Sequence, residues 1–189
     1  MTARKGQSNA HTLFGLTQIP GDNQIRTLLD PVPPALWGPV FDHGFSTLVQ
    51  TQQLAAFQSW QKRRLVVLEG TPYFTSQNIS CPQCARQTHR TGTTTYAPRM
   101  LTPVSVAPHQ HKVIPLPPEF LGPQDGQAKP DCENAAAQRW LHKYAAPYRA
   151  HNLTILGEDL SATQPLCEVL IEERLPFLLV GKPDSQPTL

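Results

Sequence analysis

The chain lacks the long hydrophobic runs of a membrane protein. No apolar segment in its 189 residues approaches the ~20 residues that a transmembrane helix needs. The N-terminal residues 1–11 contain no hydrophobic stretch of the kind found in a secretory signal peptide. We therefore expect a soluble, cytoplasmic protein without a membrane partner.

Cysteine and net charge are also scarce. The chain has four cysteines, and two of them form a Cys-x-x-Cys pair, which suits a reducing compartment better than a disulfide framework. Sixteen basic and fourteen acidic residues give a formal net charge of +2. This balance permits an anionic partner without requiring one, because many proteins with neutral surfaces fall in the same range.

Proline, by contrast, is abundant. Twenty prolines among 189 residues are roughly twice the ordinary frequency. Because each proline fixes φ and removes a backbone donor, the sequence predicts many turns and few long helices. The length and the 39% of hydrophobic residues suffice for one main core with a small appendage.

The N-terminal part of the chain is predicted to be helical. Residues 1–13 are polar and aperiodic, which is typical of a flexible lead-in. Residues 23–29 and 34–53 carry apolar side chains at helical spacing, and prolines separate the two segments. We therefore expect a small helical N-terminal region over residues 14–62.

The rest of the chain alternates strands and helices. Periodicity predicts, in chain order, strands at 65–68, 93–106 and 112–116, a helix at 132–144, a strand at 153–156, a helix at 163–174 and a strand at 177–180. A polar insertion at 72–92 interrupts this order, and the proline-rich passage at 115–130 predicts a loop, since it leaves no room for a regular helix. The pattern predicts an α/β domain with flanking helices over residues 63–189.

Two of the predicted strands run directly into acidic residues. Glu69 follows the strand at 65–68, and Glu158 and Asp159 follow the strand at 153–156. A strand end is a rigid platform, so acids on two neighbouring strand ends can hold a divalent metal. Taken alone, either site is also explained by a solvated acid in a turn.

Six segments of the sequence occur together in a specific order. They are residues 15–30 (GLTQIPGDNQIRTLLD), Leu68-Glu69-Gly70-Thr71, Cys81-Pro82-Gln83-Cys84, Pro117-Pro118-Glu119-Phe120, Asp131-Cys132-Glu133 and Lys182-Pro183-Asp184-Ser185. In this order they resemble a bacterial insertion-sequence transposase of the DDE type, and the resemblance covers nearly the whole chain from Phe14. It implies an RNase H-like mixed sheet whose first and fourth strands lie side by side, bringing residue 69 close to residue 158. It also implies DNA as a partner. A homo-oligomer is compatible with the sequence, which does not determine the oligomeric state.

The same resemblance implies two-metal chemistry. In the family, three carboxylates hold two magnesium or manganese ions for phosphoryl transfer on DNA. Two of the family acids are aspartates, where this chain carries Glu69 and Glu158, with Asp159 as an alternative to Glu158. Glutamate is one methylene longer, which moves the carboxylate by on the order of 1 Å.

The third family acid lies on a helix after the final strand. This chain ends at Leu189, before such a helix. The resemblance therefore predicts a truncated copy that lacks the last helix of the fold and is catalytically inactive. The alternatives are a noncatalytic DNA-binding or interaction protein derived from a transposase, and a fragment that folds poorly because one face of its sheet is uncovered.

A metal site is also predicted around the Cys-x-x-Cys pair. Cys81 and Cys84, followed by His89, resemble half of a zinc site, because thiolates two residues apart can reach one tetrahedral ion. Candidates for the fourth ligand are Cys132, His109 and His111. The alternative is a turn with two reduced, partly buried cysteines.

Three arginines are candidates for DNA contacts. Arg86, Arg90 and Arg99 lie around a run of threonines and can touch successive phosphates, although a solvated basic loop explains them equally. On the predicted helix at 132–144, Glu133 lies in the first turn, where the helix dipole favours a carboxylate. Trp140 on the same helix is expected in the core rather than on a base-stacking platform.

Overall fold

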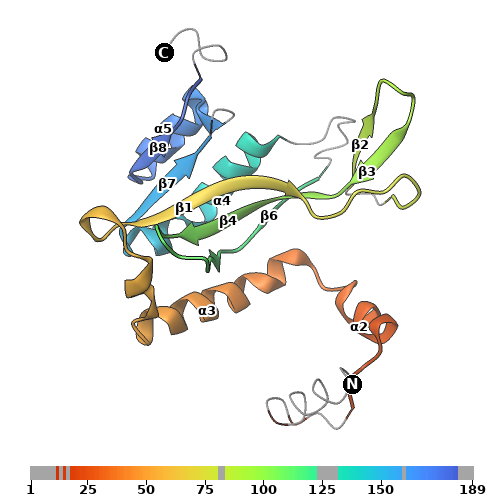
Figure 1. Ribbon diagram of the computed structural model, residues 1–189, viewed down its shortest axis with the longest axis horizontal. Helices are drawn as coiled ribbons and strands as arrows, with labels where there is room; N and C mark the ends of the chain where they lie inside the picture. Colours follow the sequence, from red (N-terminus) through yellow and green to blue (C-terminus); the bar gives the residue numbers. More distant parts are fainter. Residues whose placement is uncertain are drawn as a thin grey trace. The chain divides into compact units, whose positions relative to one another are not determined.

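Two units make up the chain. The computed structural model (Figure 1) describes residues 12, 15, 18–80, 84–122, 132–158 and 161–182. By its internal contacts the chain divides into Met1–Pro39 and Val40–Leu189. The first unit contains α2 (Asp22–Leu29), which confirms the helix predicted at 23–29, and the short 3-10 helix η1 (Pro34–Trp37). Neither helix contains a buried residue.

Three helical segments lead into the sheet of the second unit. They are α3 (Gly38–Gln50), η2 (Gln53–Phe57) and η3 (Trp60–Lys62). Phe45, Leu54 and Phe57 are buried and belong to the same hydrophobic core as the sheet. Part of the region predicted as a separate helical segment therefore helps to build the main core, and the division of the chain falls at Pro39.

A mixed sheet forms the centre of the second unit. Its strands are β1 (Arg64–Pro72), β4 (Arg99–Val106), β5 (Ile114–Pro115), β6 (Glu119–Leu121), β7 (Leu153–Gly157) and β8 (Phe177–Leu179). The strand order is β5-β4-β1-β7-β8, with β6 also paired to β4. β4 runs antiparallel to β1, whereas β7 is parallel to both β1 and β8. The predicted α/β class with a mixed sheet is confirmed.

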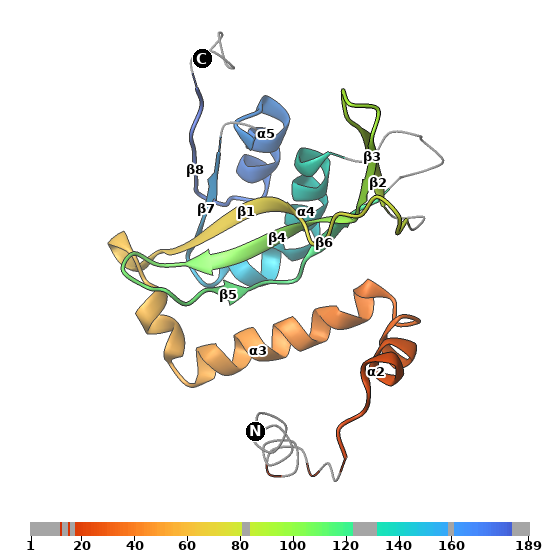
Figure 2. The same ribbon diagram turned by 45° about the vertical axis from the view of Figure 1, so that its right-hand side comes forward.

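Two helices cover one face of this sheet. α4 (Glu133–Arg149) and α5 (Gln164–Glu172) lie side by side behind β1 and β7, as Figure 2 shows. Trp140 is 1% exposed, as predicted, and its Nε1 donates to the carbonyl oxygen of Pro117 over 2.8 Å. None of the described helices is long and apolar enough to cross a membrane.

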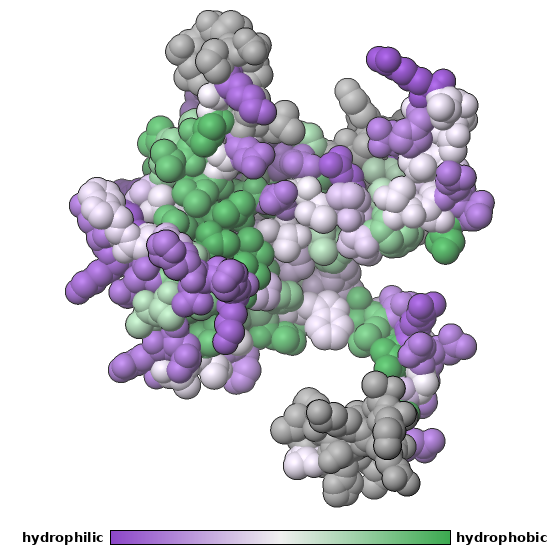
Figure 3. Space-filling view, viewed as in Figure 1, coloured by the Kyte–Doolittle hydropathy of each residue, from purple (hydrophilic) through white to green (hydrophobic). Residues whose placement is uncertain are grey.

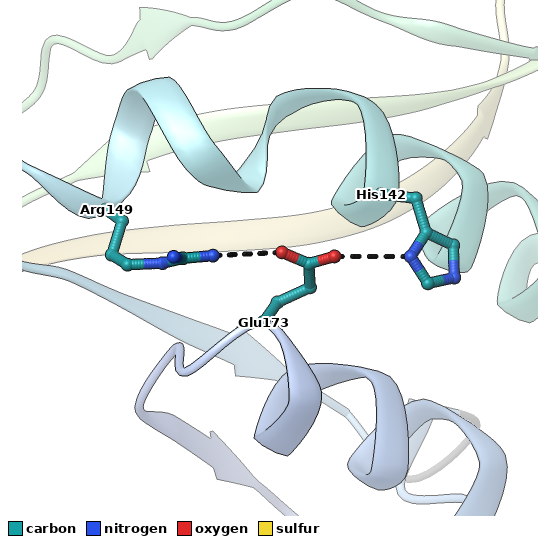
Figure 4. Close-up of polar contacts among 3 residues, drawn as sticks. All are labelled: His142, Arg149 and Glu173. Carbon is teal, nitrogen blue, oxygen red and sulfur yellow. Dashed lines mark hydrogen bonds and ion pairs between the residues drawn. The ribbon is translucent and has the colours of Figure 1, made fainter.

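An acidic residue just after α5 ties the two helices together. Glu173 accepts from Nη2 of Arg149 over 3.0 Å and lies 3.3 Å from Nδ1 of His142, so one carboxylate contacts two side chains of α4 (Figure 4). Surface contacts of this kind contribute little individually to stability, but here they fix the end of α5 against α4.

The opposite face of the sheet is also apolar. Side chains alternate along a strand, so the buried pair Val66 and Ile155 faces the helices, and the pair Val67 and Leu156 faces the other way. Leu178 pairs with Leu156 and is 64% exposed. Figure 3 shows apolar side chains gathered over β1, β7 and β8.

One strand of a hairpin was not predicted. β2 (Ala85–Thr88) lies within the segment interpreted as a polar insertion, and it pairs with β3 (Thr94–Ala97) in a hairpin that projects beyond the end of β1 and β4 (Figure 2). The single strand predicted at 93–106 is divided into β3 and β4. The prediction that residues 115–130 form only loop is wrong, because Pro115 lies in β5 and residues 119–121 form β6. β6 contains no proline, so its backbone N–H groups can form hydrogen bonds in the pairing with β4.

Candidate functional site

The parallel pairing of β1 and β7 brings two of the predicted acids to one place. The last pair in register is Val67 with Leu156, and Glu69 and Glu158 each come two residues later on strands that run in the same direction. Both side chains are exposed and line one cavity of about 490 Å³. Asp159, the alternative to Glu158, lies outside the described residues.

A third carboxylate reaches this cavity from the first turn of α4. Glu133 lines the cavity, and its side chain fills the space where a Cβ on Gly70 would be. Arg99 donates from Nη2 to Oε1 of Glu133 over 2.7 Å. Glu133 therefore has both the predicted place at the helix N-terminus and an ion pair that sequence reasoning missed. No local pattern in the sequence marks this ion pair.

We call this space the carboxylate cavity. Its lining includes Glu69, Gly70, Glu133, Glu158, Ser161 and Lys182. It lies at the carboxyl end of β7, where the parallel pairing with β1 stops and β1 continues to Pro72 beside β4. Ligands of open α/β sheets bind beyond the carboxyl ends of parallel strands. Lys182 also lines the cavity and adds one positive charge to the three acids.

The donor chemistry of the cavity fits a hard divalent cation. Mg²⁺ prefers oxygen ligands and is commonly held by one or two carboxylates together with water and substrate phosphates. Glu69 and Glu158 supply such a pair of carboxylates. Among the described residues no three His, Cys, Asp or Glu side chains form a group that could hold a metal.

A second hollow, of about 740 Å³, lies along the β2–β3 hairpin. We call it the basic hollow, and its lining includes Pro72, Thr75, Arg86, His89, Thr95 and Arg99. His89 is held in place by a hydrogen bond of 2.9 Å between its Nε2 and the Thr95 hydroxyl. Two of the three predicted DNA-contacting arginines therefore share one surface. The third, Arg90, is exposed in the hairpin turn and is not among the described lining residues.

Comparison with protein-family models, with curated proteins and with solved structures finds no match to this chain. The carboxylate cavity and the basic hollow are therefore interpreted from their geometry and chemistry.

The predicted zinc ligands are spread over several elements. Cys81 lies outside the described residues, and Cys84 is buried and disulfide-bonded, a state in which its sulfur is not a thiolate ligand. His89 lies in the hairpin, where it contacts Thr95. Cys132 is exposed at the N-cap of α4. The zinc site remains a prediction, whereas the interpretation of Cys84 as a reduced cysteine is wrong, because its sulfur is already bonded to another sulfur.

The two histidines considered as alternative ligands lie together elsewhere. His109 and His111 are exposed in the turn between β4 and β5, and His109 has a positive φ of 63°. This turn joins the antiparallel strands β4 and β5.

Proposed function

We propose that this chain is a relative of DDE-type transposases, with an RNase H-like domain that binds DNA and a carboxylate site that no longer supports strand cleavage. One observation carries the proposal: the parallel pairing of β1 and β7 directs Glu69 and Glu158 into one cavity. The resemblance implies this adjacency of the first and fourth strands of the core. The order strand, strand, strand, helix, strand, helix, strand is also present once the hairpin and β6 are set aside.

The chemistry of the cavity supports weak metal binding without turnover. A magnesium or manganese ion held by Glu69 and Glu158 would polarise a phosphodiester. Glutamate places its carboxylate one methylene further out than aspartate, and catalysis tolerates such displacement poorly. Glu133 is already paired with Arg99, and Lys182 reduces the negative charge of the cavity. We therefore propose that DNA binding is retained and cleavage is lost.

The site is tested by metal binding and by cleavage of plasmid DNA. The full chain should bind Mn²⁺, measured by titration calorimetry, and the double variant Glu69→Gln/Glu158→Gln should not. Glu172→Gln, which removes an exposed acid on α5, is the matched control and should bind like the unmodified chain. Equal Mn²⁺ binding by the double variant would disprove the carboxylate site.

The inactivity is tested separately. Supercoiled plasmid incubated with the chain and Mg²⁺ or Mn²⁺ should show no nicking above background. Robust nicking that disappears in Glu69→Ala would overturn the inactive part of the proposal while supporting the family assignment.

A second candidate, a noncatalytic DNA-binding protein, is favoured by the basic hollow. Arg86, Arg99 and His89 gather there without an acidic residue among the described lining residues. Binding of duplex DNA is measured over a salt series, because contacts to phosphates release counterions and make affinity fall with salt. Absence of any salt-dependent affinity would remove both DNA-directed functions.

A further inference from the structure

Arg99 belongs to both sites. It lines the basic hollow, and its guanidinium pairs with Glu133, which lines the carboxylate cavity. Its backbone is held on two sides, because Arg99 is in register with Pro72 of β1 and with Leu121 of β6. Arg99 therefore extends into the hollow from the rigid main sheet.

The pair with Glu133 leaves Arg99 able to contact a ligand. The ion pair uses Nη2, and a guanidinium carries donors on three nitrogens. The Arg99 side chain is 42% exposed. A phosphate can thus accept from Arg99 while the carboxylate of Glu133 still holds the opposite side of the guanidinium.

The lining of the hollow indicates which part of a nucleic acid it suits. Its described lining residues include two arginines, a histidine and two threonines, but no Phe, Tyr or Trp. Single-strand binders generally stack bases on aromatic rings, whereas contacts to a duplex backbone come from arginine and hydroxyl groups. The hollow therefore suits the phosphates of duplex DNA.

We propose that the basic hollow binds a backbone phosphate of duplex DNA through Arg86 and Arg99, and that Glu133 is the positioning residue that holds the Arg99 guanidinium in place for it. This deepens the proposed function and rests on it only for the identity of the ligand. Glu133 also keeps its position because Gly70 carries no side chain.

The proposal makes an unusual prediction about charge. Removing an acid near a polyanion normally tightens binding, because a repulsion disappears. If Glu133 positions Arg99, Glu133→Gln should instead weaken binding by about 2- to 10-fold, since a long side chain must then be ordered on binding. The sign of the change separates positioning from simple repulsion.

The measurement is fluorescence anisotropy of a labelled DNA duplex with the full chain in EDTA, so that no metal is needed. Arg86→Gln and Arg99→Gln should weaken binding and each reduce the salt slope by about one. Glu119→Gln is the matched control, because Glu119 accepts from Nε of Arg139 over 2.9 Å and lines neither site. It should leave affinity unchanged or slightly tighter.

A second variant displaces Glu133 without changing any charge. Alanine at position 70 would collide with the Glu133 side chain and push it away from Arg99. Gly70→Ala should therefore weaken DNA binding as Glu133→Gln does. The double variant Gly70→Ala/Glu133→Gln should bind DNA no more weakly than either single variant, because both changes remove the same contact. Thermal melts of every variant check that each chain is folded.

Each contrary result has a definite meaning. Tighter binding by Glu133→Gln, matching Glu119→Gln, would overturn the positioning role. Unchanged affinity in both Arg86→Gln and Arg99→Gln would show that the hollow does not bind DNA. Stronger competition by an unlabelled single strand than by duplex would overturn the choice of ligand. Because EDTA is present throughout, none of these results depends on the metal site of the proposed function.

Discussion

The paired strands β1 and β7 differ between their two ends. We call the region around Arg64 and Leu153, where the pairing starts, the packed end, and the region of Glu69 and Glu158, beyond the last parallel pair, the open end. At the packed end, Arg64 donates from Nη1 to the carbonyl oxygen of His151 over 2.6 Å, and the backbone N–H of Arg64 donates to Asn152 over 3.0 Å. The ring of Phe45 lies edge-on to Tyr148 and His151, with centroids 5.0 and 5.1 Å away. At the open end lie the exposed carboxylates of the cavity.

The packed end of these two strands contributes to stability, whereas their open end is suited to ligand binding. The packed end combines aromatic contacts with backbone hydrogen bonds, which supply stability. Burial, helped by the charge of Asp42, raises the pKa of Tyr148 there, so its hydroxyl stays neutral. The open end places carboxylates of like charge in one cavity. This arrangement favours binding of a cation at the expense of the stability of the unliganded protein. The following predictions test this comparison, from the largest expected effect to the smallest.

Truncation of an aromatic side chain at the packed end should have the largest effect. Phe45→Ala should lower the free energy of unfolding by about 3–5 kcal/mol, because it removes a buried ring and leaves a cavity. Val49→Ala on the same helix is the control, since Val49 is 36% exposed, and should cost less than about 1 kcal/mol. Urea denaturation measures both. Equal losses would show that the packed end does not support the fold.

A small residue near the open end is sterically constrained. A Cβ on Gly157 would lie 2.7 Å from Cδ2 of Leu179 and 2.9 Å from Cβ of Ser161. Gly157→Ala should therefore cost about 1–3 kcal/mol of stability through overpacking. Gly44→Ala has open space in a helix and should instead gain up to about 1 kcal/mol. Gains in both variants, measured by urea denaturation, would contradict tight packing at Gly157.

The packed end should make stability depend on pH. Burial, and secondly the charge of Arg64, lowers the pKa of His151 below its ordinary 6.5. The unfolded chain then binds the proton more readily, so this contribution is complete above pH 6.5 and declines as the pH falls through the folded pKa. His151→Gln should flatten that part of the profile. An identical decline in the variant would assign it to other groups.

Neutralising the acids of the open end should have the smallest effect on folding. Glu69→Gln/Glu158→Gln should change the free energy of unfolding by less than about 0.5 kcal/mol, because both side chains are exposed. Thermal and urea denaturation in EDTA measure this change. A loss of several kcal/mol would show that the two carboxylates support the fold itself.

Local patterns in the sequence located most elements of the second unit. Continuous apolar runs predicted β1 and β7. Both faces of these strands are apolar, so hydrophobic residues follow one another without alternating with polar ones. Helical spacing marked α4 and α5. The hairpin strand β2 gave no such signal, since all but one of its residues are polar and its strand character comes only from pairing with β3.

The candidate site divides in the same way. The sequence by itself determined that Glu69 and Glu158 follow two apolar runs, because the hydrophobic residues stop where the side chains reach solvent. The prediction that Glu69 follows the end of its strand is wrong, because pairing with β4 extends β1 to Pro72. Only the tertiary structure decided that Arg99 pairs with Glu133 beside Gly70 and also lines the hollow at the hairpin. These residues belong to β4, α4 and β1, and no local periodicity records which elements meet. Their contact follows from strand register and helix packing, which depend on the whole core.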